Sequence, residues 1–348
     1  MGWPVRKLIE DGVLSMLQVN MGLQEGERLL VVVDPPTLTH WLDKDLTELE
    51  SQLERSVLAR MVADIARESF PACNVEFYPY PSVGQHGSEP GEFVAEKMRQ
   101  ADVLVAIVNY SLSHTNARAG ATEAGARIAS MPGFDARMFH PGGPMSVDYH
   151  QVAADTEKLA QLLTEAATAT VRSPGGTDIT FSVAGRSGGL DTGLCAERAA
   201  WSNLPAGETY AAPVEGTAEG VIVAEAGWYP NLDEDMVFRF EGGLVVRLEG
   251  GGKVGDEFRE LLQLESDKAT YQARRNLAEL GIGTNPNAKQ PDNVLEAEKI
   301  KGTVHLAIGD SSHMGGEVVA DLHEDFVIPQ PDLVLDDKLV IEGGVWKV

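Results

Sequence analysis

Apolar and polar residues follow two different patterns along the chain, and the pattern changes near its middle. In the first half, apolar stretches of strand length are separated by segments in which apolar residues recur at helical spacing. The apolar stretches are 28–34, 75–80 and 102–110, and the helical segments are 42–68, 92–100 and 117–129. Strands that alternate with helices form a parallel sheet covered on both faces. We therefore predict an open parallel α/β domain over residues 1–172.

The second half begins after a turn signal, Ser173-Pro174-Gly175-Gly176, which follows a long amphipathic segment at 148–167. Beyond it, glycine-rich stretches with β-branched residues dominate, and one helical segment covers 255–279. We predict a mainly β (α+β) metal-binding domain over residues 173–348, so that the fold class of the whole chain is α/β. The strand-sized stretches are 179–183, 220–226, 236–240, 243–248, 302–308 and 326–334.

Composition and charge narrow the choice of partners. The chain of 348 residues has 53 Asp and Glu against 28 Lys and Arg, a net charge of -25. Its field repels nucleic acids and anionic lipids, so we expect neither nucleic acid nor membrane as a partner. No apolar run approaches the roughly 20 residues of a spanning helix, and Glu10 and Asp11 interrupt any signal-peptide core. We expect a cytoplasmic protein with a small-molecule or small-peptide substrate.

The sequence contains no strong nucleotide-binding motif and no cysteine-rich site. A GxGxxG motif does not follow the first strand, and a Walker A motif is absent from the sequence. The two cysteines, Cys73 and Cys195, are far apart. A metal ion would therefore have to be bound by histidine and carboxylate side chains.

Histidines and carboxylates concentrate near the C-terminus. His305, His313 and His323 lie within 19 positions of one another. Because side chains alternate along a strand, His323 and Asp325 project from the same face, and an imidazole beside a carboxylate is half of a metal site. The alternative is that each histidine is a hydrogen-bonded core residue. The carboxylates in and around this stretch are Glu296, Glu298, Asp310, Glu317, Asp321 and Asp325.

Four short segments occur in the order found in the thermophilic metallo-aminopeptidases, the aminopeptidase T and S group. They are 176–180, 204–213, 305–309 and 323–325. The second half resembles this family closely and the first half resembles it in its α/β pattern. The resemblance implies a homodimer and one or two divalent ions, Zn, Co or Mn, held between the domains. The metal ligands that it implies are Glu208, Glu279, His305, His323 and Asp325.

The chain departs from the aminopeptidase pattern at three places. The L-G-E motif is Leu280-Gly281-Ile282, with Glu279 just before it. Ile300 stands where the family has an acid, with Glu298 two residues earlier, and Ser312 stands where it has a tyrosine. On this resemblance, the general base is Glu298, with Glu296 as the next choice, and His313 or Tyr210 takes the polarising role of the missing tyrosine.

A related branch, the 2,5-dihydroxypyridine 5,6-dioxygenases, is similar over 279–283 and 315–325 and ends in 335–338. In that branch a histidine at the position of Glu279 joins the H-x-D pair to bind one iron(II). Here the residue is glutamate, whereas facial-triad oxygenases normally use two histidines and one carboxylate. The iron(II) interpretation therefore requires His305 to supply the second histidine.

Three functions remain open from the sequence. The leading hypothesis is a metallo-aminopeptidase-like hydrolase, in which a metal-activated water attacks a peptide bond. The second is an iron(II) ring-cleaving dioxygenase. The third is a non-catalytic relative that binds a small molecule.

Overall fold

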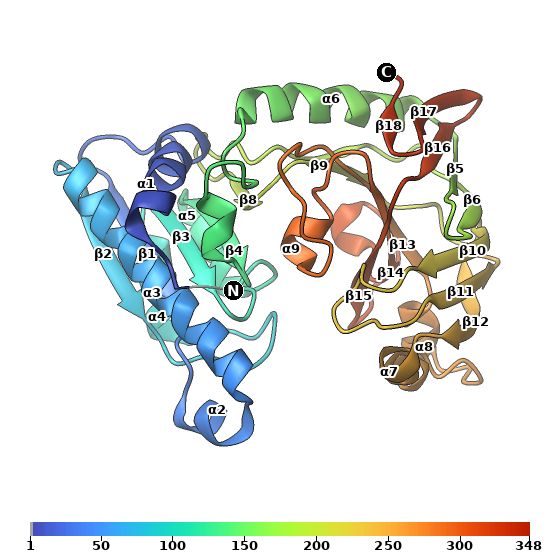
Figure 1. Cartoon of the computed structure of the whole chain (residues 1–348), viewed down its shortest axis with the longest axis horizontal. Coiled ribbons are helices and arrows are strands. Elements are labelled where there is room, and N and C mark those ends of the chain that lie inside the picture. Colours follow the sequence, from blue (N-terminus) through green and yellow to red (C-terminus); the bar gives the residue numbers. More distant parts are fainter. Residues whose placement is uncertain (1–2) are drawn as a thin grey trace. The chain divides into compact units, whose positions relative to one another are not determined.

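The computed structural model describes residues 3–348, which form two compact units (Figure 1). Unit 1 comprises Met1–His150 and Thr192–Ala206, and unit 2 comprises Gln151–Asp191 and Gly207–Val348. The two units are thus interleaved along the chain, whereas the sequence analysis expected one boundary at 172/173. Within the described residues, no helix is both long enough and apolar enough to cross a membrane.

Unit 1 is an open parallel sheet with the strand order β2-β1-β3-β4-β8, and each neighbouring pair is parallel. All six residues of β3 are buried, as in a strand covered on both faces. The predicted parallel α/β class is therefore confirmed. The strands are β1 (Arg28–Val33), β2 (Asn74–Pro79), β3 (Val103–Val108), β4 (Arg127–Pro132) and β8 (Trp201–Asn203).

Helices pack along this sheet, and four of those described, α2, α3, α5 and η2, begin at a residue whose side chain caps the helix. α3 contacts β1, β2 and β3, whereas α4 and α5 share a buried apolar cluster with Leu30 and Leu104. The Asp45 carboxylate accepts a hydrogen bond from the Glu48 amide at the start of α3. The helices of this unit are α1 (Arg6–Ser15), η1 (Met16–Asn20), α2 (Leu38–Asp43), α3 (Leu46–Ser69), α4 (Glu92–Gln100), α5 (Asn116–Ala124) and η2 (Ala136–Phe139).

The predicted helix at 117–129 is wrong in its second part. Gly125 adopts a left-handed conformation (φ 104°) and ends α5 at Ala124. The chain then enters β4, which the sequence analysis did not predict.

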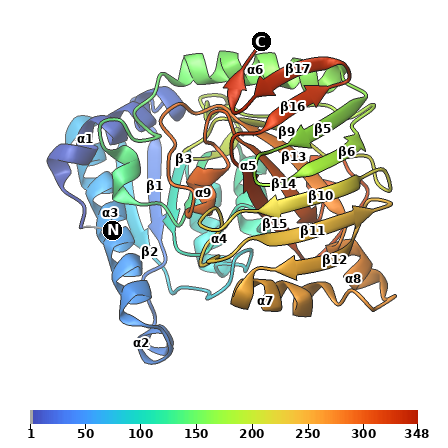
Figure 2. The ribbon, with the colours of Figure 1, turned by 45° about the vertical axis from the view of Figure 1, so that its right-hand side comes forward.

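Unit 2 consists of two antiparallel sheets, in agreement with the predicted mainly β domain, together with α6 (Tyr149–Glu165), which starts in unit 1. The larger sheet has eight strands, several of which lie side by side in Figure 2. In order across the sheet they are β12 (Leu244–Gly250), β11 (Met236–Glu241), β10 (Glu219–Ala224), β6 (Asp178–Ser182), β5 (Thr168–Arg172), β16 (Asp332–Leu335), β17 (Lys338–Glu342) and β18 (Val345–Trp346).

The smaller sheet of unit 2 has five strands and carries the residues discussed below. All of its neighbouring strands are antiparallel. In order they are β15 (His323–Ile328), β14 (Val304–Gly309), β13 (Leu277–Gly283), β9 (Glu208–Ala211) and β7 (Gly189–Asp191).

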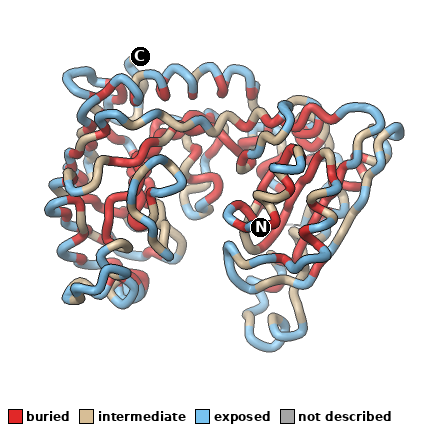
Figure 3. Tube along the Cα trace, turned by 180° about the vertical axis from the view of Figure 1, so that it is seen from behind, coloured by how far each residue is buried: buried red, intermediate tan, exposed pale blue. Residues whose placement is uncertain are grey.

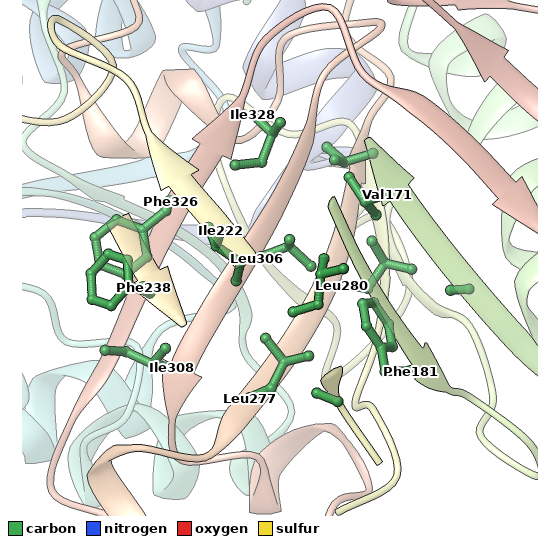
Figure 4. Close-up of a cluster of buried hydrophobic side chains, with 14 of the residues drawn as sticks. Val171, Phe181, Ile222, Phe238, Leu277, Leu280, Leu306, Ile308, Phe326 and Ile328 are labelled. Atoms are coloured by element: carbon green, nitrogen blue, oxygen red, sulfur yellow. The ribbon is translucent and has the colours of Figure 1, made fainter. Parts of the chain in front are cut away.

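Apolar side chains of both sheets form one core in unit 2 (Figure 4). Leu280, Leu306 and Phe326 from the five-stranded sheet join Phe181 and Phe238 from the eight-stranded sheet. The rings of Phe238 and Phe326 lie 4.7 Å apart, centre to centre. In both units the buried residues follow the strands and the inward sides of the helices (Figure 3).

The predicted helix at 255–279 is also wrong in its second part. It is divided into α7 (Gly252–Leu262) and α8 (Ala269–Arg274), and the chain then enters β13. The first break occurs at Gln263, which adopts a left-handed conformation (φ 44°). Two short helices, α9 (Val294–Ala297) and η3 (Ser312–Met314), complete unit 2.

Candidate metal centre

One face of the five-stranded sheet is apolar and packs into the core, while the opposite face carries acids and histidines. On β14, Leu306 and Ile308 belong to the core, and His305 projects from the other face. On β15, Phe326 belongs to the core, and His323 and Asp325 share the opposite face. Alternation along these two strands therefore places both histidines and Asp325 on one side of the sheet, as the sequence pattern predicts.

A β-bulge turns Glu279 toward the same face. The pairing of β13 with β14 shifts register between Leu277 and Glu279, so that Leu277 and Leu280 both reach the core. Glu279 then projects from the face that carries His305 and His323. Without this irregularity, Leu277 and Glu279 would lie on one face.

A glycine makes room for the His305 ring. Gly281 pairs directly with His305 across β13 and β14. A Cβ atom at position 281 would lie 1.9 Å from His305 Nε2, far inside van der Waals contact. The ring therefore lies across the bare backbone of Gly281.

Glu279, His323 and Asp325 form the most compact group of possible metal ligands among the described residues. One ligand atom from each of the three lies within 4.8 Å of the others. His323 Nε2 is 3.1 Å from Glu279 Oε2 and 3.6 Å from Asp325 Oδ2. Carboxylate oxygens and an imidazole nitrogen suit a divalent transition-metal ion.

The orientation of His323 is that of a metal ligand. Its Nδ1 donates a hydrogen bond of 2.7 Å to the carbonyl oxygen of Asp310, so Nε2 faces the carboxylates. Metal-binding histidines usually donate their second ring nitrogen to such an acceptor. Although burial opposes a charge on the ring, Asp325 and Glu279 raise the pKa of His323 well above its ordinary value. A metal ion bound at Nε2 would replace the proton that these acids hold there.

His305 lies beside the same group and is almost completely buried. Its Nε2 is 3.3 Å from Glu279 Oε1 and 3.4 Å from Glu208 Oε2. Burial alone would lower the pKa of His305, but the hydrogen bond to Glu279 and the charge of Glu208 raise it to about 9. His305 Nδ1, Glu208 Oε2 and Asp325 Oδ1 are buried without a hydrogen-bond partner in the described chain. Such atoms indicate a site whose ligand completes the hydrogen bonding or coordination. The residues therefore fit a divalent metal ion.

A buried lysine adjoins this group. Lys299 is 1% exposed, and its Nζ lies 2.5 Å from Glu208 Oε1 and 2.9 Å from Glu298 Oε2. Asp191, at the end of β7, is 3.9 Å away. Burial would lower the pKa of Lys299, but the charges of Glu208, Glu298 and Asp191 outweigh it and hold that pKa well above its ordinary value. Lys299 is therefore a buried cation.

Of the two residues expected to be catalytic, Glu298 and His313, Glu298 lies in this cluster. Desolvation by burial raises the pKa of Glu298 to about 8, against the opposing charge of Lys299. His313 lies at the edge of the cluster, where its Nδ1 is 2.9 Å from Asp310 Oδ1 and its ring is 5.1 Å from that of His323. Tyr210 shares the sheet face with Glu208, and burial raises its pKa to about 12.

Glu296, the next choice for proton transfer, has a structural role. Its Oε1 accepts hydrogen bonds from the backbone amides of Lys289 and Gln290 and so holds the loop before α9. The sequence could not separate the two roles. Glu296 binds backbone amides of the loop before α9, whereas Glu298 contacts the buried Lys299.

The sequence analysis missed Lys299 and Asp191. The run Glu296-Ala297-Glu298-Lys299-Ile300-Lys301 has the composition of a solvated turn, and Asp191 belongs to no motif. Asp191 reaches Glu208 because β7 pairs with β9. Lys299 reaches Glu208 because the chain after α9 returns to Asn285, whose amide binds the Lys299 carbonyl.

Comparison with known proteins gives the family. The model of the 2,5-dihydroxypyridine 5,6-dioxygenases matches residues 51–347. A 2,5-dihydroxypyridine 5,6-dioxygenase of Pseudomonas putida KT2440 is 24% identical over 272 residues, which are 73% of this chain and 73% of that protein.

Two solved structures share the fold. The 2,5-dihydroxypyridine dioxygenase from Pseudomonas putida KT2440 superposes with a TM-score of 0.71 at 16% identity, covering 97% of this chain and 96% of that one. AmpT from Thermus thermophilus superposes with a TM-score of 0.63 at 16% identity, covering 99% and 100%.

The aminopeptidase resemblance, which the sequence analysis placed first, is thus matched in fold, whereas the dioxygenase branch, which it placed second, is matched in family. The family match covers most of the chain, including β9, β13, β14 and β15, from which the acids and histidines project. This chain belongs to the 2,5-dihydroxypyridine 5,6-dioxygenase family, a family of enzymes.

Proposed function

We propose that this protein is an iron(II)-dependent dioxygenase that opens a hydroxylated pyridine or related aromatic ring. The observation that carries the proposal is the compact group Glu279, His323 and Asp325 in a chain of this family. These three residues would hold the ion, with His305 beside them. When bound, iron(II) would supply the redox chemistry by which dioxygen reacts with the ring.

The surrounding side chains would position the ligands and carry protons. The carbonyl of Asp310 fixes the His323 ring. With a pKa raised to about 8 by burial, Glu298 holds a proton near neutral pH and can exchange it with a hydroxyl group of a bound ring. A buried, neutral carboxylic acid that both donates and accepts hydrogen bonds suits a substrate with ring hydroxyl groups.

The hydrolase hypothesis predicts different behaviour from the same residues. A metallo-aminopeptidase would use Zn, Co or Mn to activate water and would need no oxygen. A non-catalytic relative would bind a small molecule without any metal. Metal identity and oxygen dependence therefore separate the three hypotheses.

The test is an oxygen-uptake assay on protein purified anaerobically, stripped with a chelator and reloaded with iron(II), zinc, cobalt or manganese. With 2,5-dihydroxypyridine and related hydroxylated rings as substrates, we expect oxygen consumption with iron(II) alone. The His323→Ala variant should lose it, whereas His150→Ala, which removes an exposed histidine at the start of α6, should retain it. Hydrolysis of aminoacyl anilides with zinc, cobalt or manganese, and no oxygen uptake with iron(II), would overturn the proposal in favour of the hydrolase.

A further inference from the structure

Two groups of side chains meet in the candidate metal centre, and only one of them offers an open place for a metal ion. The first group is Glu279, His323 and Asp325. In the second, the carboxylates of Asp191, Glu208 and Glu298 surround Lys299 Nζ. All of these residues belong to unit 2.

Glu208 and His305 join the two groups. Glu208 Oε1 is 2.5 Å from Lys299 Nζ, and Glu208 Oε2 is 3.4 Å from His305 Nε2. His305 Nε2 is in turn 3.3 Å from Glu279 Oε1. The whole cluster therefore contains five carboxylates and two imidazoles, enough protein ligands for two divalent ions with three or four ligands each.

The carboxylates around Lys299 are those that a hard divalent cation would use. Carboxylate oxygens from β7, from β9 and from the end of α9 converge on one point, and that point is an ammonium group. The lysine cannot easily move away, because its backbone is fixed on both sides. Its amide donates to the carbonyl of Glu296, and its carbonyl accepts from the amide of Asn285.

We propose that the ammonium group of Lys299 is a built-in cation that fills the second cation position of this cluster and so restricts the centre to one divalent ion. The inference rests on the proposed metal site, but it does not depend on which reaction the ion supports.

The charges of the cluster agree with this assignment. Two divalent ions would balance four of the five carboxylate charges. One divalent ion and the ammonium of Lys299 balance three of them, with the ammonium placed among Asp191, Glu208 and Glu298. Removing the charge of Lys299 takes away the cation that Glu208 and Glu298 contact in a buried site, and a second metal ion would restore the balance.

The test is a metal titration that does not depend on catalysis. Metal-free protein is titrated with Co²⁺ and separately with Mn²⁺, and bound metal per chain is counted by element-resolved mass spectrometry after buffer exchange. The variants are Lys299→Met, which removes the charge and keeps most of the stem, and Lys299→Arg, which keeps the charge. Lys301→Met is the matched control, because Lys301 pairs with Asp155 away from the cluster and is partly exposed.

We expect one ion per chain in the wild-type protein, in Lys299→Arg and in Lys301→Met, and two in Lys299→Met. The second equivalent should also raise the thermal midpoint of Lys299→Met but not that of the control. If Lys299→Met does not fold without metal, the double variant Lys299→Met/Glu298→Gln replaces it, because it also removes the carboxyl group of Glu298 beside the lost ammonium and keeps Asp191 and Glu208. That variant should also take up a second ion.

Two ions in the wild-type protein, or a single ion at saturating metal in folded Lys299→Met or in the folded double variant, would overturn the inference and leave the proposed function standing. No ion in the wild-type protein would instead overturn the proposed metal centre itself. The two failures are therefore distinguishable in one experiment.

Discussion

Substitution of Gly281 by alanine tests whether the His305 ring is held against bare backbone. The new Cβ would lie 1.9 Å from Nε2, 2.1 Å from Cε1 and 2.6 Å from Cδ2 of His305, whereas ordinary contacts begin near 3.4 Å. The ring would have to move by about 1.5 Å, out of a site that is 1% exposed. Overpacking of this kind costs about 1–3 kcal/mol of unfolding free energy. We therefore expect Gly281→Ala to be destabilised by that amount.

The assay is urea unfolding of metal-free protein, followed by fluorescence and circular dichroism. Gly120→Ala is the control, since Gly120 lies in helix α5 and its added Cβ would meet nothing closer than 3.9 Å. It should be neutral or more stable by about 0.5–1 kcal/mol. The decisive measurement repeats Gly281→Ala in a His305→Ala background, where the cost should largely disappear. An equal cost with and without the ring would refute the reasoning.

Further predictions concern the metal, the pH dependence and the core. His323→Ala should lose bound iron(II), measured as metal per chain, while Glu257→Gln on the surface of α7 should retain it. The pKa values of His305 and Glu298 are raised to about 9 and about 8 in the folded protein, so both groups favour the protonated folded state. Their stabilising effect is complete at low pH. As pH rises, each group loses this effect between its pKa in the unfolded chain, about 4.5 for Glu298 and 6.5 for His305, and its raised pKa in the folded protein. The unfolding free energy of metal-free protein should therefore fall between pH 6.5 and 9, less steeply in Glu298→Gln, and an unchanged slope in that variant would contradict the assignment. Phe326→Ala should cost about 3–5 kcal/mol in the same unfolding assay, because the ring is completely buried in the shared core of unit 2.

Segments with regularly spaced apolar residues were predictable from the sequence, whereas the points at which two helices end were not. Continuous apolar runs such as β3, and alternating runs such as β11, carry their own signal in the spacing of apolar residues. The second parts of the predicted helices at 117–129 and 255–279 are wrong because the left-handed residues Gly125 and Gln263 end α5 and α7. Gly125 is a recognisable stop signal, whereas glutamine at a left-handed position is not. As a result, the strand that carries Glu279 was predicted as helix.

Two of the predicted metal ligands, His323 and Asp325, were predictable from the alternation of side chains along one strand. Alternation along one strand places His323 beside Asp325, and this could be read from three residues. Glu279 required the bulge in β13, which no local pattern announces, and it entered the prediction only through the family resemblance. Lys299 is the most informative omission. A lysine next to a glutamate is ordinary surface composition, and its charge acquires a role only because separate strands bring Asp191 and Glu208 to it. Residue type and spacing predict ligands such as His323 and Asp325, but the number of ions depends on the complete charge of the cluster, including a cation that the chain itself supplies.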